Sequence, residues 1–215
     1  MIDLHTHTLF SDGELLPSEL VRRAEVIGYE AVALTDHADS SNLEWIVPRL
    51  VQVCGDLNAH WKIRVIPGIE LTHVPPALIG ALAQKARSLG ARIVVVHGET
   101  PVEPVPPRTN RMAIEAGVDI LAHPGFITEA DAREAGRRGV TLELSGRGGH
   151  SLTNGHVAMT ARKAGAAVIF GSDMHSTRDI MDRAMAERVL RGAGLSPEEV
   201  AAAFAHAAKI AGLAM

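Results

Sequence analysis

Seven short apolar runs recur along this 215-residue chain, and stretches with helical character separate them. The runs span residues 2–7, 30–37, 63–71, 91–98, 118–125, 140–146 and 166–173. Most are rich in β-branched residues and lack polar alternation, which is the pattern of parallel strands buried on both faces of a sheet. Strands of this kind that alternate with helices predict an α/β fold.

The stretches between the runs carry helix start and stop signals. Residues 17–28 begin with Pro17 and end at Gly28, the usual order of these two residues at helix ends. In residues 196–213, Ser196 and Glu199 have the spacing of a capping box. Further helices are expected over three stretches, residues 76–90, 128–139 and 176–194.

No linker-like composition interrupts the alternation of strands and helices. The simplest architecture is therefore one (β/α) barrel of about seven strands, forming a single domain over residues 1–215. An open doubly wound sheet is the alternative. No glycine-rich dinucleotide-binding motif follows any of the runs, which weakens that alternative.

Composition limits the possible partners and the expected location. The net charge is −4 and there is no basic run, so we expect no membrane binding and no binding of long nucleic acids. Cys54 is the only cysteine, which rules out an intramolecular disulfide, and we expect it to be buried and inert. The first residues lack the pattern of a signal peptide, and no apolar run approaches ~18 residues. We expect a cytoplasmic protein.

Histidines and carboxylates cluster at the ends of the predicted strands. The first strand contains His5 and His7, which alternation places on one face together with Asp3. The later strand ends carry Asp36, His37, Glu70, His97, His123, Glu143, Asp173 and His175. In a (β/α) barrel these carboxyl ends converge on one mouth, where active sites lie. Buried carboxylates need opposite charge, so we predict a metal site there.

Other histidines are expected to have different roles. His60, His150 and His206 lie outside the strand ends, and we expect them to be solvated or to cap helices. His73 follows the third strand by two residues and His156 lies in a helical segment. For these two histidines the sequence leaves structural and functional roles open.

Two carboxylates are expected to support the site, and the roles of three more stay open. We expect Asp3 and Asp36 to orient imidazoles through hydrogen bonds. Glu143 could do the same, or could be a barrel residue with its own partners. Glu99 and Glu103 lie in a proline-rich loop, residues 98–111, where they could be scaffolding or substrate contacts.

The ordered set of motifs resembles one known family. The motifs are LHTHTLFSDGE, LTDH, GIE, a histidine at the end of the fourth strand, AHPG and GSDMH. In this order they are similar to those of the polymerase-and-histidinol-phosphatase (PHP) family of metal-dependent phosphoesterases, over the chain from residue 3 to about residue 180. The resemblance implies a distorted (β/α)7 TIM-like barrel with a trinuclear metal centre.

The resemblance also implies a set of ligands for three divalent ions. The first ion would be held by His5, His7, Glu70 and Asp173, the second by Glu70, His97 and His123, and the third by Asp12, His37 and His175. Many family members have histidine in place of Asp12, but a carboxylate is also a competent ligand. Imidazole and carboxylate ligands suit Zn, Mn or Fe, so the metal identity stays open.

Three divalent ions carry six positive charges, and the carboxylates of Asp12, Glu70 and Asp173 would cancel three of them. A positive field would therefore remain. Such a field suits a phosphate dianion. We therefore expect hydrolysis of a small phosphomonoester, histidinol-phosphate-like or nucleotide-like, by attack of a metal-bridging hydroxide. Glu70, Asp173 and His175 are the expected catalytic residues, and Arg147 and Arg108 the expected phosphate-binding residues.

Three other functions stay open. A phosphodiesterase or nuclease acting on nucleotides or short oligonucleotides needs similar metals. An amidohydrolase also begins with an HxH strand, but it often bridges its metals with a carboxylated lysine. Lys62, Lys85, Lys163 and Lys209 all lie in helical segments or at a strand start. A non-enzymatic binding module is the third possibility, although this chain retains all nine ligand positions. The leaving group and the oligomeric state are not predicted.

Overall fold

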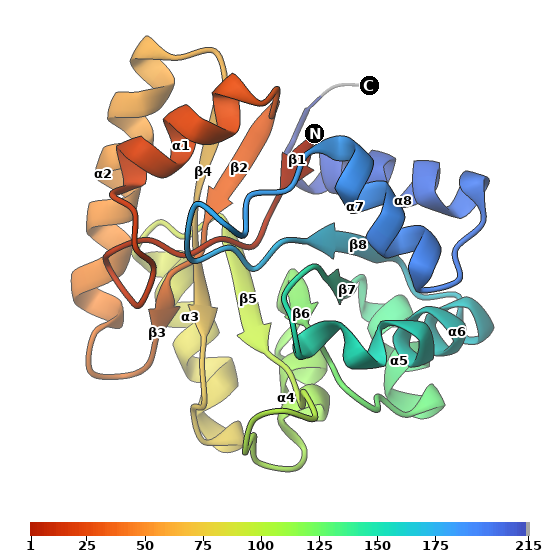
Figure 1. Cartoon of the computed structure of the whole chain (residues 1–215). Coiled ribbons are helices and arrows are strands. Elements are labelled where there is room, and N and C mark those ends of the chain that lie inside the picture. Colours follow the sequence, from red (N-terminus) through yellow and green to blue (C-terminus); the bar gives the residue numbers. More distant parts are fainter. Residues whose placement is uncertain (214–215) are drawn as a thin grey trace.

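The computed structural model describes residues 1–213, so the last two residues of the predicted 1–215 domain lie outside the described residues. Its centre is one parallel sheet (Figure 1). The strands are β1 (Ile2–Asp3), β2 (Ala31–Leu34), β3 (His37–Ala38), β4 (Arg64–Leu71), β5 (Ile93–His97), β6 (Ile120–Ala122), β7 (Thr141–Ser145) and β8 (Val168–Gly171). They run in the order β1-β2-β4-β5-β6-β7-β8, and β3 also pairs with β4.

All seven predicted strands are present, and one of them is divided in two. Both β2 and β3 pair in parallel with β4, at Ala31–Leu34 and at His37–Ala38. They are therefore two segments of the strand expected over residues 30–37. The short interruption between them contains Asp36, whose carboxylate binds a neighbouring loop.

The sheet closes between its first and last strands. Thr6 and Met174 form a parallel bridge beyond the ends of β1 and β8. The backbone N–H of His7 donates to Met174 O at 2.9 Å, and that of Asp173 donates to His5 O at 3.0 Å. The predicted (β/α)7 barrel is confirmed, and the open doubly wound sheet is wrong. The barrel is distorted because the closing contacts involve irregular segments, which supply His5, His7 and Asp173.

Helices surround the sheet (Figure 1). They are α1 (Pro17–Val26), α2 (Leu43–His60), α3 (Ile79–Ser88), α4 (Thr109–Ala116), α5 (Glu129–Arg138), α6 (Asn154–Ala164), α7 (Arg183–Gly192) and α8 (Pro197–Ile210), with short 3₁₀ turns η1 (Pro76–Leu78) and η2 (His150–Thr153). Cys54 is buried in α2 and burial raises its pKa to about 12, as expected for an inert thiol. No helix within residues 1–213 is both long enough and apolar enough to cross a membrane.

The helix predicted over residues 176–194 begins seven residues late, at Arg183. The preceding segment is a loop because Asp179 accepts hydrogen bonds from the backbone N–H groups of His175 and Ser176, at 3.0 and 2.8 Å. Asp182 then caps α7 by accepting from the N–H of Met185. The loop holds His175 at the carboxyl end of the barrel.

The barrel interior is filled mainly by small and β-branched side chains. Ala31 and Ala33 of β2 face Ile93 and Val95 of β5 in one buried cluster. Helix α8 contributes Ala207 to this cluster, as does Ala211 directly after the helix, and a separate apolar layer packs between the strands and the other helices. The interior is thus largely a packed apolar core.

We expect the capping box of α8 to stabilise the whole fold. The Ser196 side chain accepts from the N–H of Glu199 at 3.3 Å, and the Glu199 side chain accepts from the N–H of Ser196 at 2.8 Å. Ser196→Ala should lower the free energy of unfolding by about 1 kcal/mol in urea denaturation. Ser196→Asp retains an acceptor and should stay near the wild type; equal losses for both variants would contradict this role.

Candidate metal centre

The carboxyl ends of the strands meet at one end of the barrel, and their histidines and carboxylates lie together there. The structure brings into one cluster all nine residues predicted as ligands: His5, His7, Asp12, His37, Glu70, His97, His123, Asp173 and His175. Most of these side chains are buried, and Asp12 is the exposed exception. Their proximity agrees with the prediction, whereas their role as ligands stays a prediction.

The Glu70 carboxylate lies at the centre of this cluster and is fully buried. Its Oε1 lies 3.4 Å from His5 Nε2, 3.4 Å from His97 Nδ1 and 3.8 Å from His123 Nε2. Its Oε2 lies 2.5 Å from His37 Nδ1 and 3.8 Å from His7 Nε2. Burial disfavours its charge, but His5 and His37 hold the pKa of Glu70 well below its usual range. Glu70 can therefore join the groups on either side of it.

Asp173 provides the second buried carboxylate. Its Oδ1 lies 3.3 Å from His7 Nε2 and 3.8 Å from His5 Nε2, and its Oδ2 lies 3.8 Å from His123 Nε2. Burial opposes ionisation here too, but the neighbouring imidazoles, His5 first, lower the pKa of Asp173. The carboxylate is thus available as an anion.

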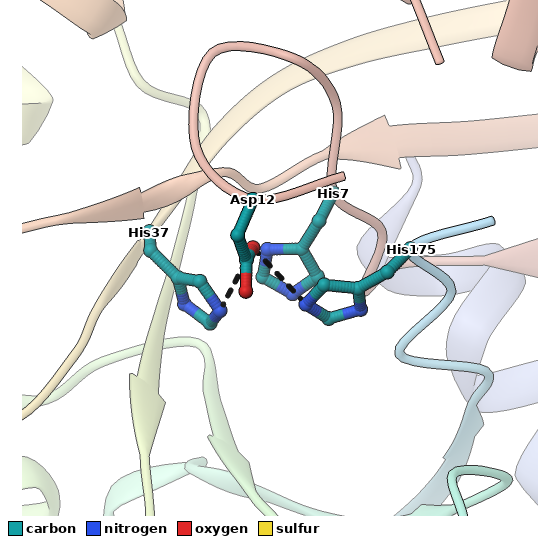
Figure 2. Close-up of side chains that lie close together, drawn as sticks. All are labelled: His7, Asp12, His37 and His175. Carbon is teal, nitrogen blue, oxygen red and sulfur yellow. Dashed lines mark ion pairs between the residues drawn. The ribbon is translucent and has the colours of Figure 1, made fainter. Parts of the chain in front are cut away.

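A third group lies nearer to solvent, where Asp12 approaches two imidazoles. Figure 2 shows Asp12 between His37 and His175, with His7 beside them. Asp12 Oδ1 lies 3.4 Å from His37 Nε2 and 3.2 Å from His175 Nε2. The Asp12 side chain is 57% exposed, unlike the two inner carboxylates.

Irregular backbone aims two of these side chains. His123 and Asp173 have positive φ angles of 28° and 54°, which are uncommon for residues other than glycine. Both follow the end of a strand, so the unusual conformation turns their side chains toward the mouth. Strain of this kind persists only where the surrounding structure enforces it.

The donor set fits divalent cations. Several ring and carboxylate atoms in the cluster are buried and make no hydrogen bond within the described residues: His5 Nε2, His7 Nδ1 and Nε2, Glu70 Oε1, His97 Nδ1 and Nε2, and His123 Nδ1. Buried polar atoms without partners are costly, so atoms gathered at one place indicate a missing partner. Nitrogen and oxygen atoms in such groups are suitable ligands for Zn, Mn or Fe. The clusters could therefore bind metal ions.

Glu143, whose role the sequence left open, lies behind one of these imidazoles. Its Oε2 lies 2.5 Å from His5 Nδ1, and both side chains are fully buried. Gly171 of the adjacent strand makes room for this carboxylate, since a Cβ at that position would collide with it. The contact leaves His5 Nε2 facing Glu70.

Two other carboxylates have a different role from the one expected. Asp3 accepts from the backbone N–H groups of His5 and Ser172, at 3.3 and 3.2 Å. Asp36 accepts from the N–H and hydroxyl groups of Thr8 and Ser11. The prediction that they orient imidazoles is wrong, because within the described residues each carboxylate accepts from backbone or hydroxyl groups and from no imidazole. The prediction that Asp3 shares one face of the first strand with His5 and His7 is also wrong. Asp3 pairs with Val32, and Val32 packs in the apolar layer between the strands and the helices, so Asp3 lies on that outer face.

His150 was expected to be solvated or to cap a helix, and that is wrong. It is buried, and its ring stacks on His123 with centroids 4.0 Å apart. Its Nε2 lies 3.7 Å from Asp173 Oδ2, and its Nδ1 lies 2.8 Å from the Thr100 hydroxyl. The glycine-rich segment 146–149, directly after β7, is the sequence signal for a loop that folds back here.

His73 and Glu103, also left open, both reach the mouth. His73 Nε2 lies 2.9 Å from Glu103 Oε2, and Glu103 also lies 3.1 Å from His97 Nε2 and 3.4 Å from His150 Nε2. Its contact with His97 is the main reason that the pKa of Glu103 falls to about 2. This carboxylate joins residues from three separate segments of the chain: His73 after β4, His97 at the end of β5 and His150 in η2.

The two predicted phosphate-binding arginines lie in different places. Arg147 Nη1 lies 2.6 Å from His175 Nδ1 and donates to Asp173 O at 3.2 Å. Arg108 is exposed at the start of α4. Nearby Arg111 pairs with Asp131 at 2.6 Å.

The remaining histidines lie away from the cluster. His60 is exposed at the end of α2. His156 Nε2 donates to Ile127 O at 2.8 Å, and His206 Nε2 lies 2.9 Å from the Thr141 hydroxyl. His60 and His206 have no contact with the predicted ligands in these interactions, in line with the expected structural roles.

A small cavity opens over the cluster. Its volume is about 220 Å³, and it is lined by Asp12, His37, Thr72, His73, His97, Glu103, Arg147, His150, Asp173 and His175. Arg147 is therefore placed at the mouth, as predicted, whereas Arg108 is not among the lining residues. The phosphate-binding role of both arginines stays a prediction.

Comparisons with known proteins agree with the resemblance seen in the sequence. A family model described as PHP domain matches residues 3–122. An uncharacterized protein of Methanocaldococcus jannaschii is 48% identical over 206 residues, which cover 95% of this chain and 94% of that protein. Ribonuclease P protein component 3 of Methanosarcina barkeri is 30% identical over 139 residues, 62% of this chain and 52% of that protein.

Among solved structures, the histidinol phosphate phosphatase of Lactococcus lactis, complexed with Zn, L-histidinol and phosphate, has a similar fold. The TM-score is 0.62 at 17% sequence identity, and the match covers 91% of this chain and 94% of that one. At this identity the likeness supports the shared fold.

We expect metal binding to stabilise the protein. Zn²⁺ or Mn²⁺ at about 100 times its Kd should add about 2.7 kcal/mol to the free energy of unfolding, relative to protein in chelator. In calorimetry this should raise the Tm by about 5–10 °C. His123→Ala should lose much of this rise. His60→Ala, at an exposed position on α2, is the matched control and should retain it. An unchanged Tm of the wild type in saturating metal would contradict the assignment.

Proposed function

This chain belongs to the PHP domain family, and from that premise we propose that it is a metal-dependent phosphoesterase acting on a small phosphomonoester. The observation that carries the proposal is the pair of buried carboxylates, Glu70 and Asp173, among imidazoles whose nitrogens lack partners. An arginine, Arg147, lies beside them at the cavity. This combination suits an anionic substrate bound next to cations.

Three divalent ions, Zn, Mn or Fe, would occupy three subsites. The ligands proposed are His5, His7, Glu70 and Asp173 for the first, Glu70, His97 and His123 for the second, and Asp12, His37 and His175 for the third. When bound, such ions supply positive charge to phosphate oxygens and make water nucleophilic near neutral pH. The three carboxylates neutralise half of the six positive charges, which leaves a net attraction for a phosphate dianion.

The protein's own side chains hold and orient the substrate. Glu70, Asp173 and His175 are the proposed catalytic residues, because their side chains lie in the cluster beneath or beside the cavity. Arg147, which already lies against Asp173 and His175, would bind a phosphate oxygen. Glu143 keeps His5 turned so that Nε2 faces Glu70.

The size of the cavity favours a small substrate. At about 220 Å³ it has room for a phosphate group and a short part of its alcohol. The net charge of −4 gives no broad attraction for long nucleic acids. A small phosphorylated metabolite or nucleotide is therefore the proposed partner, and histidinol phosphate is one member of that class.

A phosphodiesterase is the second candidate. It is favoured by the 30% identity to Ribonuclease P protein component 3, which covers 62% of this chain. A diester would need space for a second esterified group beside the phosphate. Because the cavity, lined in part by Glu103 and His150, is about 220 Å³, a nucleotide or short oligonucleotide end would fit it better than the middle of a strand. The amidohydrolase alternative has less support, since all four lysines are exposed and none lines the cavity over the cluster.

We expect the metal-loaded protein to hydrolyse p-nitrophenyl phosphate faster than its bis-ester. Three variants each remove a proposed ligand: His5→Ala, Glu70→Ala and His123→Ala. Each should lower the metal content of the protein, and each should lower kcat/KM by about 100-fold or more. Elemental analysis and a steady-state assay measure the two effects, with His60→Ala as the control. Full activity in all three variants would rule the proposal out, and faster turnover of the bis-ester would favour the diesterase.

Arg147 offers a separate test of phosphate binding. Arg147→Gln should raise KM for the phosphomonoester by about 10- to 100-fold, because a charge-assisted contact to phosphate is lost. Arg147→Lys retains the charge but not the planar guanidinium group, so its KM should lie between those of the wild type and Arg147→Gln. Arg111→Gln is the control, since Arg111 pairs with Asp131. A KM for Arg147→Gln equal to the wild-type value would show that Arg147 does not bind the phosphate.

A further inference from the structure

His97 presents its two ring nitrogens to two different carboxylates. Nδ1 lies 3.4 Å from Glu70 Oε1, inside the cluster, whereas Nε2 lies 3.1 Å from Glu103 Oε2, on the side of the cavity. The residue is only 3% exposed, and neither nitrogen makes a regular hydrogen bond within the described residues. Each ring nitrogen therefore faces one carboxylate, Glu70 for Nδ1 and Glu103 for Nε2.

A neutral imidazole has one N–H and one lone pair, and only the lone pair can bind a metal. If Nδ1 faces the second subsite with its lone pair, the proton must be on Nε2 and requires an acceptor. Glu103 provides a carboxylate oxygen at that point, 3.1 Å from Nε2. Carboxylates placed behind metal-binding histidines commonly fix the tautomer and the ring orientation in this way.

Glu103 is itself held in position from both sides. His73 Nε2 lies 2.9 Å from Oε2, and His150 Nε2 lies 3.4 Å from Oε1. The surrounding loop contains four prolines between residues 101 and 107 and is tied to His150 through the Thr100 hydroxyl. The carboxylate is thus fixed over His97 rather than free in solvent.

The first subsite contains the same arrangement in a more buried form. Glu143 Oε2 contacts His5 Nδ1, so that His5 Nε2 faces Glu70. In both cases one nitrogen faces a carboxylate outside the cluster, and the other faces Glu70 Oε1. The two carboxylates come from unrelated places, since Glu143 is on β7 and Glu103 is in a loop.

We propose that Glu103 is a positioning residue for the second metal subsite, which holds His97 as the Nε2–H tautomer with Nδ1 directed at that subsite. His73 keeps the Glu103 carboxylate over the ring. The inference rests on the metal centre of the proposed function, and it adds a residue outside the nine proposed ligands. It also gives a role to the proline-rich loop, which places the carboxylate.

The test compares Zn²⁺ affinity and the His97 tautomer in variants of the full chain. Glu103→Ala should weaken binding of one Zn²⁺ per chain by about 10- to 100-fold in titration against a competing chelator, and Glu103→Gln should weaken it less. The matched control is Glu99→Gln, in the same loop, because Glu99 Oε1 accepts from the backbone N–H of Asn110 and contacts no histidine there. Circular dichroism checks that each variant is folded.

Nitrogen-15 NMR of the imidazoles in Zn²⁺-loaded protein reads the tautomer directly. The wild type and Glu99→Gln should show the His97 proton on Nε2, and Glu103→Ala should lose this defined pattern. A proton on Nδ1 in the wild type, or Zn²⁺ affinity of Glu103→Ala within twofold of the control, would overturn the inference while leaving the metal centre intact. A wild type that binds no Zn²⁺, Mn²⁺ or Fe²⁺ would instead overturn the proposed function.

Discussion

The structure depends on the burial of the Glu70 carboxylate among imidazoles. An ionised carboxylate without compensation is too costly to bury, so positive charge must lie beside it. The contacts with His5 and His37 hold the pKa of Glu70 low and keep it charged. Burial of Glu143, by contrast, raises its pKa. One central anion therefore determines how the surrounding imidazoles are arranged.

This arrangement requires firm placement of chain segments that are not in strands or helices. Three aspartates that face away from the cluster provide it. Asp36 binds the turn that carries Asp12, Asp179 binds the backbone at His175, and Asp3 binds the backbone at His5. Backbone N–H groups need acceptors when buried, and a carboxylate accepts several at once. The acidic residues of the mouth thus divide into those that face the site and those that hold the loops.

Much of the site could be predicted from the sequence because barrel strands place their ends together. Glu70, His97 and His123 follow directly from strand positions, and the seven strands and the capping box of α8 were predicted. Other features depend on contacts between distant loops, which no local pattern encodes. His150 and Glu103 reach the mouth through irregular segments, and the start of α7 was misplaced because Asp179 binds the backbone before it.

The mouth combines ligand positions of very different exposure. Glu70 and Asp173 are nearly completely buried, so their interactions with imidazoles are weakly screened, whereas Asp12 is 57% exposed and its charge is screened by water. The turn that carries Asp12 is held in place by Asp36, outside the buried pair. A chain can therefore vary the residue at this outer position without disturbing the buried pair. The inner carboxylates offer no such freedom, because several buried imidazole nitrogens face each of them.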